Sequence, residues 1–189
     1  MNSMNESDAI YRWKRGDPEG LAVLVRLYEL RALRAAYLIL QDRMDAEDAV
    51  QNAFLRAWKY RHRFDPQRPF WPWLLQLIVR EAYRITHQRD RRFDVDHESD
   101  EERENQEGRW KDPLPTPEDW AERSERHQRL REAIADLSPA QRIAVVLRYY
   151  QELSEKEIAE IMGCSIGAVK HYLYEARLRL REALDEREG

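Results

Sequence analysis

Residues 153–170, LSEKEIAEIMGCSIGAVK, contain two helix starts separated by a turn. Ser154 and Glu157 have the spacing of a capping box, in which two side chains satisfy the first backbone N–H groups of a helix. Gly163 can adopt the left-handed conformation that ends a helix, and Ser165 can cap a second helix. Two short helices joined by such a turn are typical of a helix-turn-helix, whose second helix enters the major groove of DNA.

The second helix has two different faces on a helical wheel. Its core side consists of Val169, Leu173, Ala176 and Leu180. Its polar stripe consists of Lys170, Tyr174, Arg177 and Arg181, with Gly167 and His171 nearby on the outward side. A cationic face with hydrogen-bonding groups fits a groove of DNA. The alternative is the ordinary solvated face of a surface helix, but the capped helix and turn before it favour DNA binding.

The composition of the 189 residues favours a helical protein without internal disulfides. Charged residues make up 36% and hydrophobic residues 42%, and the lone cysteine, Cys164, excludes an internal disulfide. No apolar run approaches the length of a membrane span. Residues 1–6 lack the pattern of a signal peptide, so we expect a cytoplasmic protein without membrane insertion. A net charge of −4 argues against nonspecific nucleic-acid binding, so the distribution of charge matters more than its sum.

The apolar period of residues 1–92 predicts a small bundle of helices. A short helix over 6–15 precedes one that Asp17 caps, and Asp45 is expected to cap a third. Two prolines make residues 64–69 a loop before a fourth helix. The apolar positions of the last three helices are Leu33, Ala36, Tyr37 and Leu40; Val50, Ala53, Phe54 and Ala57; and Trp71, Leu74, Leu75 and Ile78.

The composition changes between residues 93 and 115, which contain nine acidic and three basic residues. Sparse apolar residues and two closing prolines predict a flexible acidic linker. A second domain follows at 116–189, where Thr116 caps a helix and Ser138 with Gln141 forms another capping box. Its expected core positions before the helix-turn-helix are Leu130, Ala133, Ile134, Leu137, Ile143, Val146, Leu147 and Tyr150. We therefore predict an all-α protein with two small helical domains joined by the linker.

Two stretches of this chain occur together in a known family. The first is DAEDAVQNAFLRAW at 45–58, continuing through Phe64 and Asp65 to the WLL at 73–75. The second runs from LSP at 137–139 through VLRYY at 146–150 and LSEKEIA at 153–159 to GAVK at 167–170, ending at Ala176 and Arg177. In this order, with an acidic linker between them, they resemble the extracytoplasmic-function (ECF) sigma factors, promoter-recognition subunits of bacterial RNA polymerase.

The resemblance implies a division of labour between the domains. The domain at 1–92 would bind the polymerase clamp and open the minus-ten element, and the domain at 116–189 would recognise the minus-thirty-five element. The linker would run toward the active-site cleft, where its negative charge resembles nucleic acid. Such proteins are not enzymes, and an anti-sigma factor often holds them inactive. The implied partners are core RNA polymerase, promoter DNA and an anti-sigma factor, with no cofactor.

Candidate residues follow for each contact that the resemblance implies. Polymerase binding is expected from Asp45, Glu47, Asp48, Gln51, Asn52 and Leu55. Capture of melted minus-ten DNA is expected from Arg61, Arg63, Phe64, Arg68, Phe70, Trp71, Arg80 and Arg84, since rings stack on unpaired bases and arginines hold the backbone. The alternative is that these rings pack the bundle. Minus-thirty-five recognition is expected from Arg148, Lys156, Ser165, Gly167, Lys170, His171, Tyr174, Arg177 and Arg181.

Other functions have weaker support in the sequence. The acids Asp45, Glu47 and Asp48 lie in one first turn, where they complement the helix dipole; a carboxylate metal site needs acids from several facing helices. The five histidines are scattered, so a nucleophilic triad has no support. The main alternative is a stand-alone helix-turn-helix regulator that binds DNA as a dimer, and a third is a protein–protein adaptor. The chain departs from the family pattern at Arg80, His171, Tyr172 and Glu175.

Overall fold

The structure, a computed structural model, describes residues 5–93, 130 and 132–185. Every regular element in these residues is a helix, which confirms the predicted all-α class. Apart from Phe93, the predicted linker lies outside the described residues, as does the predicted helix start at Thr116. Among the helices described, none combines the length and apolar character that crossing a bilayer requires.

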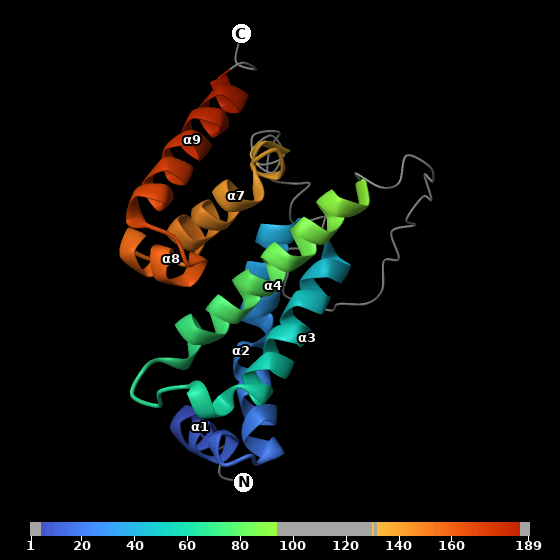
Figure 1. The fold of residues 1–189 in the computed structure, drawn as a ribbon, viewed down its shortest axis with the longest axis vertical. Helices are drawn as coiled ribbons and strands as arrows, with labels where there is room; N and C mark the ends of the chain where they lie inside the picture. Colours follow the sequence, from blue (N-terminus) through green and yellow to red (C-terminus); the bar gives the residue numbers. More distant parts are fainter. Residues whose placement is uncertain (1–4, 94–129, 131, 186–189) are drawn as a thin grey trace, which may run out of the picture.

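The N-terminal part of the structure is a bundle of helices (Figure 1). Its elements are α1 (Glu6–Lys14), α2 (Pro18–Leu40), α3 (Arg43–Lys59), the 3-10 turn η1 (Arg61–Arg63) and α4 (Phe70–Phe93). The Asp17 side chain accepts a hydrogen bond from the Glu19 amide at 2.9 Å and Pro18 is the first helical residue, so the predicted start of α2 is confirmed. The predicted loop at 64–69 also separates η1 from α4.

The start of α3 differs from the prediction. Asp42, and not Asp45, caps this helix: its extended backbone lets the carboxylate accept a hydrogen bond from the Asp45 amide at 2.9 Å. Gln41, with a left-handed φ of 55°, ends α2 one residue earlier, so Asp42 is the residue that starts the next helix. Asp45 therefore lies inside the first turn of α3, where its charge complements the helix dipole.

An aromatic cluster fills the end of the bundle near the loop. Trp13 and Phe70 are fully buried and Phe64 is 2% exposed. Ring centres of Trp13 lie 5.4 Å from Phe70 and 5.7 Å from Phe64 in edge-to-face arrangements, the geometry that aromatic pairs prefer. Gly20 lets α1 approach α2 closely, because a Cβ there would lie 2.4 Å from the backbone nitrogen of Trp13. The buried rings of Trp13, Phe64 and Phe70 thus hold the loop at residues 64–69 against the bundle.

The C-terminal part contains the predicted helix-turn-helix. Its elements are α7 (Pro139–Val145), the π-helix η2 (Val146–Tyr150), α8 (Glu155–Met162) and α9 (Ile166–Asp185). Both capping boxes, at Ser138 and Ser154, form as predicted. Gly163 ends α8 with φ of 67°, and the Ser165 hydroxyl accepts a hydrogen bond from the Ala168 amide at 3.1 Å. The local pattern of residues 153–170 is confirmed.

The π-helix changes one predicted core position. Ile143, Val146 and Leu147 are buried, but Tyr150 is 44% exposed. The expected periodicity assumed 3.6 residues per turn, whereas a π-helix has a wider turn that moves later side chains around the axis. Tyr150 therefore lies on the surface.

The two parts pack against each other along α4. Helix α8 lies beside α4. Helix α7 and the π-helix η2 contact α2. Buried apolar side chains form one continuous cluster that includes Leu75 in α4 and Ile158 in α8. We call residues 5–93 the N-terminal module and residues 130 and 132–185 the C-terminal module.

Candidate functional site

The outward face of α9 is exposed as its sequence predicted. The side chain of Lys170 is 64% exposed, and its Nζ lies 3.9 Å from a Glu155 carboxylate oxygen of α8. Tyr174 is 56% exposed, and His171 is exposed with its ring 6.1 Å from that of Tyr172. On the other side, Val169, Leu173 and Ala176 are buried. The first turns of α9 thus present cationic and hydrogen-bonding groups to solvent.

Several predicted DNA-contacting residues also stabilise the module itself. Arg148 Nη1 donates to the Leu153 carbonyl at 2.9 Å, which holds the turn before α8. Arg177 Nε donates to the Leu173 carbonyl at 3.0 Å, and Ser165 caps α9. Gly167, Lys156 and Arg181 are exposed. Hydrogen bonds from Ser154 lower the pKa of Glu157 from its usual value, so the Glu157 carboxylate in the capping box of α8 is charged at neutral pH.

The loop expected to capture melted DNA separates its rings from its cations. Phe64, Phe70 and Trp71 are at most 7% exposed, so in this conformation none of these rings can stack on a base. The alternative left open by the sequence, packing within the bundle, is the arrangement observed. The side chain of Arg68 is 79% exposed and Arg63 is also exposed. The loop offers cations to solvent and keeps its rings as an internal support.

Arg61 is half-buried, whereas Arg63 and Arg68 are exposed. Its Nη1 donates to the Trp58 carbonyl at 2.9 Å, and its guanidinium lies 4.6 Å from the centre of the Trp58 ring. Such a cation–π contact and hydrogen bond fix the side chain against the end of α3. Arg61 therefore holds η1 in place.

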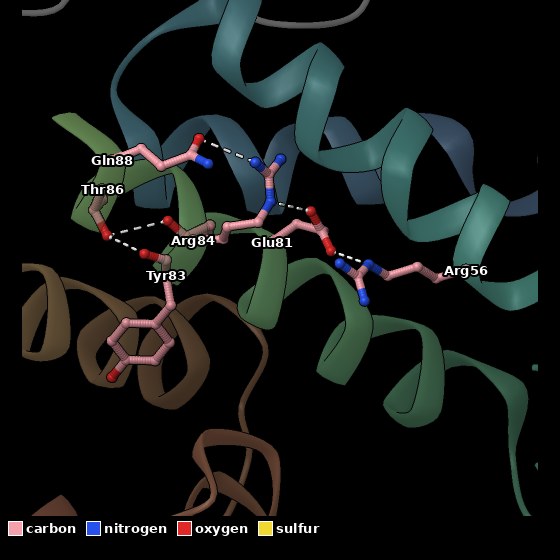
Figure 2. Close-up of polar contacts among 7 residues, drawn as sticks. Arg56, Glu81, Tyr83, Arg84, Thr86 and Gln88 are labelled. Atoms are coloured by element: carbon pink, nitrogen blue, oxygen red, sulfur yellow. Dashed lines mark hydrogen bonds and ion pairs between the residues drawn. The ribbon is translucent and has the colours of Figure 1, made fainter. Parts of the chain in front are cut away.

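Arg84 belongs to an ion cluster around the buried carboxylate of Glu81, which the sequence did not predict. Figure 2 shows the Glu81 carboxylate between Arg84 of the same helix and Arg56 of α3. Glu81 is 2% exposed, Arg84 Nε lies 2.8 Å from it, and Arg84 Nη1 donates to Gln88 at 3.0 Å. Arg80, one turn earlier, is exposed. Glu81 thus joins α3 to α4 and orients Arg84, a role that no local pattern signals.

The candidate polymerase face of α3 is partly exposed. Asp48 and Gln51 are exposed, Asn52 is half-buried, and Leu55 is 60% exposed although it is apolar. Glu47 accepts a hydrogen bond from Arg43 Nε at 2.9 Å. Asp48, Gln51 and Leu55 therefore form one accessible strip along the helix, beside buried Val50 and Phe54.

The described residues contain no group of His, Cys, Asp or Glu with the geometry of a metal site.

Comparison with known proteins identifies both modules. The family model "Sigma-70 region 2" matches residues 24–93, and the model "Sigma-70, region 4" matches residues 127–180. The ECF RNA polymerase sigma factor SigW of Bacillus subtilis is 31% identical over 176 residues, which is 90% of this chain and 92% of that protein. The ECF RNA polymerase sigma-E factor of Escherichia coli is 30% identical over 183 residues, 94% of this chain and 91% of that one.

The chain belongs to the ECF sigma factors.

The sigma factor therefore binds core RNA polymerase, recognises promoter DNA and promotes transcription initiation. Among solved structures, the sigma factor RpoE in complex with the anti-sigma factor NepR from Bartonella quintana is similar with a TM-score of 0.61 and 26% identity. That match covers 85% of this chain and 94% of that one. The structure of CnrH in complex with the cytosolic domain of CnrY has the same fold, with a TM-score of 0.64 at 21% identity over 96% of this chain and 98% of that chain.

The sigma factor also has a cavity between its modules. It measures about 360 Å³ and is lined by Arg63, Arg68, Trp73, Gln76, Glu160 and Ile161. Farther along α4, burial raises the pKa of Tyr83 to about 12, with smaller contributions from Tyr172 and Cys164 of the C-terminal module. Sequence patterns give no signal for this cavity between the loop and α8, because each module is periodic on its own.

Proposed function

We propose that α9 of the sigma factor recognises the minus-thirty-five element through Lys170, His171 and Tyr174. The observation that supports this is the exposure of all three side chains in the first turns after Ser165, where a recognition helix contacts base edges. Arg177 and Arg181 follow on the same face and are positioned for phosphates.

Alanine substitution tests this assignment. Lys170→Ala and Tyr174→Ala should each cost about 1–3 kcal/mol on the preferred promoter and relax specificity at one position. Arg179→Ala is the matched control, because at 100° per residue Arg179 lies on the opposite side of α9 from Lys170. A binding-site selection compares the preferred sequences. Unchanged selectivity in both variants would remove α9 residues 170 and 174 from base recognition.

For the N-terminal module, we propose that the exposed strip of α3 binds the polymerase clamp. Asp48, Gln51 and Leu55 are accessible and are not needed for the core, which Val50, Ala53 and Phe54 already fill. An exposed leucine flanked by polar groups suits a partner surface. Asn52, Glu47 and Asp45 extend this surface toward the start of α3.

We propose that η1 and the loop after it bind the sugar–phosphate backbone of melted minus-ten DNA. Arg63 and Arg68 are exposed cations, and Phe64 and Phe70 brace the loop from inside. Pro66 and Pro69 reduce the loop's conformational freedom and hence the entropy lost on binding. Without nucleotide hydrolysis, opening requires tighter binding to the melted strand than to duplex, and cations that follow the backbone of that strand contribute to its affinity.

The remaining roles are proposed at the level of the whole chain. We assign residues 1–92 to clamp binding and to recognition and melting of the minus-ten element. Residues 93–115 would form the acidic linker, and residues 116–189 would recognise the minus-thirty-five element. We further propose that the protein acts in the cytoplasm, has no enzymatic activity of its own, and is held inactive by an anti-sigma factor. The similarity to a sigma factor whose structure was solved with its anti-sigma factor supports the last proposal. Co-purification with core polymerase, followed by promoter-directed transcription, tests the assignment as a whole.

A further inference from the structure

Helix α1 lies outside the stretch that matches the sigma-70 region 2 model, which begins at residue 24. The helix nevertheless contacts η1 and packs against α2. Its last residue, Lys14, is half-buried, and the Lys14 Nζ donates a hydrogen bond to the Phe64 carbonyl at 2.5 Å. These two residues are 50 positions apart in the chain. The contact therefore connects a helix outside the matched stretch to the segment proposed to bind melted DNA.

The backbone of Lys14 is fixed by contacts on both sides. Trp13, the preceding residue, is fully buried, and its ring centre lies 5.7 Å from that of Phe64. Across the turn between α1 and α2, Arg12 Nε donates to the Asp17 carboxylate at 2.6 Å. The hydrogen bond from Arg12 lowers the pKa of Asp17, so this pair is charged at neutral pH. Only the side chain of Lys14 must therefore be ordered for its ammonium group to reach the loop.

The Phe64 carbonyl marks the place where the loop leaves η1. The backbone of Phe64 is extended, with φ of −74° and ψ of 131°. A tight turn follows, in which the Asp65 carbonyl accepts a hydrogen bond from the Arg68 amide at 3.0 Å and the Asp65 carboxylate accepts one from the Gln67 amide at 3.0 Å. Arg63 directly precedes Phe64, and Arg68 ends the turn. The direction of the Phe64 carbonyl therefore sets where both exposed arginines lie.

The contact with Lys14 supplies a directional restraint that the aromatic cluster lacks. Apolar packing of the Phe64 ring is not directional, so it holds the residue without fixing the orientation of its carbonyl. A hydrogen bond from an ammonium group is directional, short and roughly twice as strong as one between neutral groups. The ring and the carbonyl of Phe64 are thus held by two neighbouring residues of α1, Trp13 and Lys14.

We propose that Lys14 is a positioning residue for the capture of melted DNA. By binding the Phe64 carbonyl it keeps Arg63 and Arg68 in the arrangement that binds the sugar–phosphate backbone, so less conformational entropy is lost when the strand binds. The effect on DNA binding rests on the proposed function of these two arginines. The ordering of the loop does not, because it is a property of the free protein.

The first experiment measures hydrogen–deuterium exchange of the full-length chain. Lys14→Met should make the amides of residues 61–70 exchange roughly tenfold faster, because a hydrogen bond from a charged group is lost. Lys14→Arg should keep the exchange slow, since arginine is also a charged donor. Arg15→Met is the matched control: it removes a positive charge at the next residue, whose guanidinium contacts Tyr11 of the same helix. Amides of α3 are the internal reference for a general loss of stability.

The second experiment separates positioning from a direct contact with DNA. Holoenzymes assembled from core polymerase and each variant bind a fluorescent single strand that spans the minus-ten element of a promoter they transcribe. Lys14→Met should lower the affinity by about three- to tenfold, following the fraction of the loop in its binding arrangement, and Lys14→Arg should retain it. With Arg63 and Arg68 already changed to alanine, Lys14→Met should have no further effect, because residues that act through one another are not additive.

The outcomes distinguish this inference from the proposed function of the loop. Unchanged exchange of residues 61–70 in folded Lys14→Met would overturn the positioning role. An equal loss of affinity with and without the two arginines would also overturn it, because Lys14 would then contact DNA directly. Faster exchange in Lys14→Met, together with unchanged affinity of Arg63→Ala/Arg68→Ala, would keep Lys14 as the residue that orders the loop and would reject the role of the arginines in DNA binding.

Discussion

The ion cluster around Glu81 gives the sharpest quantitative prediction for stability. Its carboxylate is 2% exposed, while the side chains of Arg56 and Arg84 are 46% and 40% exposed. Glu81→Gln leaves two cations that can turn toward water, so we expect a loss of about 1.5–3 kcal/mol, the usual contribution of hydrogen bonds to a charged group. The double variant Arg56→Ala/Arg84→Ala leaves a buried carboxylate without a partner, which costs about 3–5 kcal/mol.

The test is whether the double arginine variant loses more stability than Glu81→Gln. Urea unfolding followed by circular dichroism gives the free energy of unfolding of each variant. Arg68→Ala is the control, because its pair with Asp65 at 3.8 Å is exposed and such pairs contribute about 0–1 kcal/mol. A double arginine variant more stable than Glu81→Gln would refute the reasoning that the buried carboxylate dominates the cluster.

Two further predictions concern the N-terminal module. Charge reversal at Asp48 combined with Gln51→Ala should weaken binding to core polymerase in a titration while circular dichroism stays unchanged; reversal at Glu182 in α9 is the control, and equal affinity would reject this surface. Arg63→Ala with Arg68→Ala should reduce initiation from a duplex promoter and leave a pre-melted bubble template active, because the bubble no longer requires capture of newly opened strands. Equal activity of this variant on both templates would exclude a melting role for the loop.

Local features of the fold could be predicted because they depend on residues close together in the chain. The capping boxes at Ser138 and Ser154, the glycine turn at Gly163 and the two faces of α9 each involve neighbours within one or two helical turns. Hydrogen bonds of this kind form wherever the helix starts, independent of the rest of the molecule. The cap of α3 was predicted wrongly because both Asp42 and Asp45 are suitable cap residues. The left-handed backbone of Gln41 ends α2 directly before Asp42, so Asp42 is the cap.

Family membership likewise followed from the sequence, because two specific stretches in fixed order carry it. The position of the rings that were expected to capture DNA did not follow from the sequence. A phenylalanine in the sequence does not show whether its ring contacts a base or packs in the core. The contacts of Phe64 and Phe70 with Trp13 of α1 show that both rings belong to the core.

The tertiary structure alone decided how the modules meet. Gln151 contacts residues 80 and 120 positions earlier in the chain, and Glu81 pairs with an arginine from another helix. Apolar periodicity shows which face of a helix is buried but not which partner covers it. The polar groups that select one partner are single residues without a repeating pattern, so their roles become visible only when the helices are placed in space.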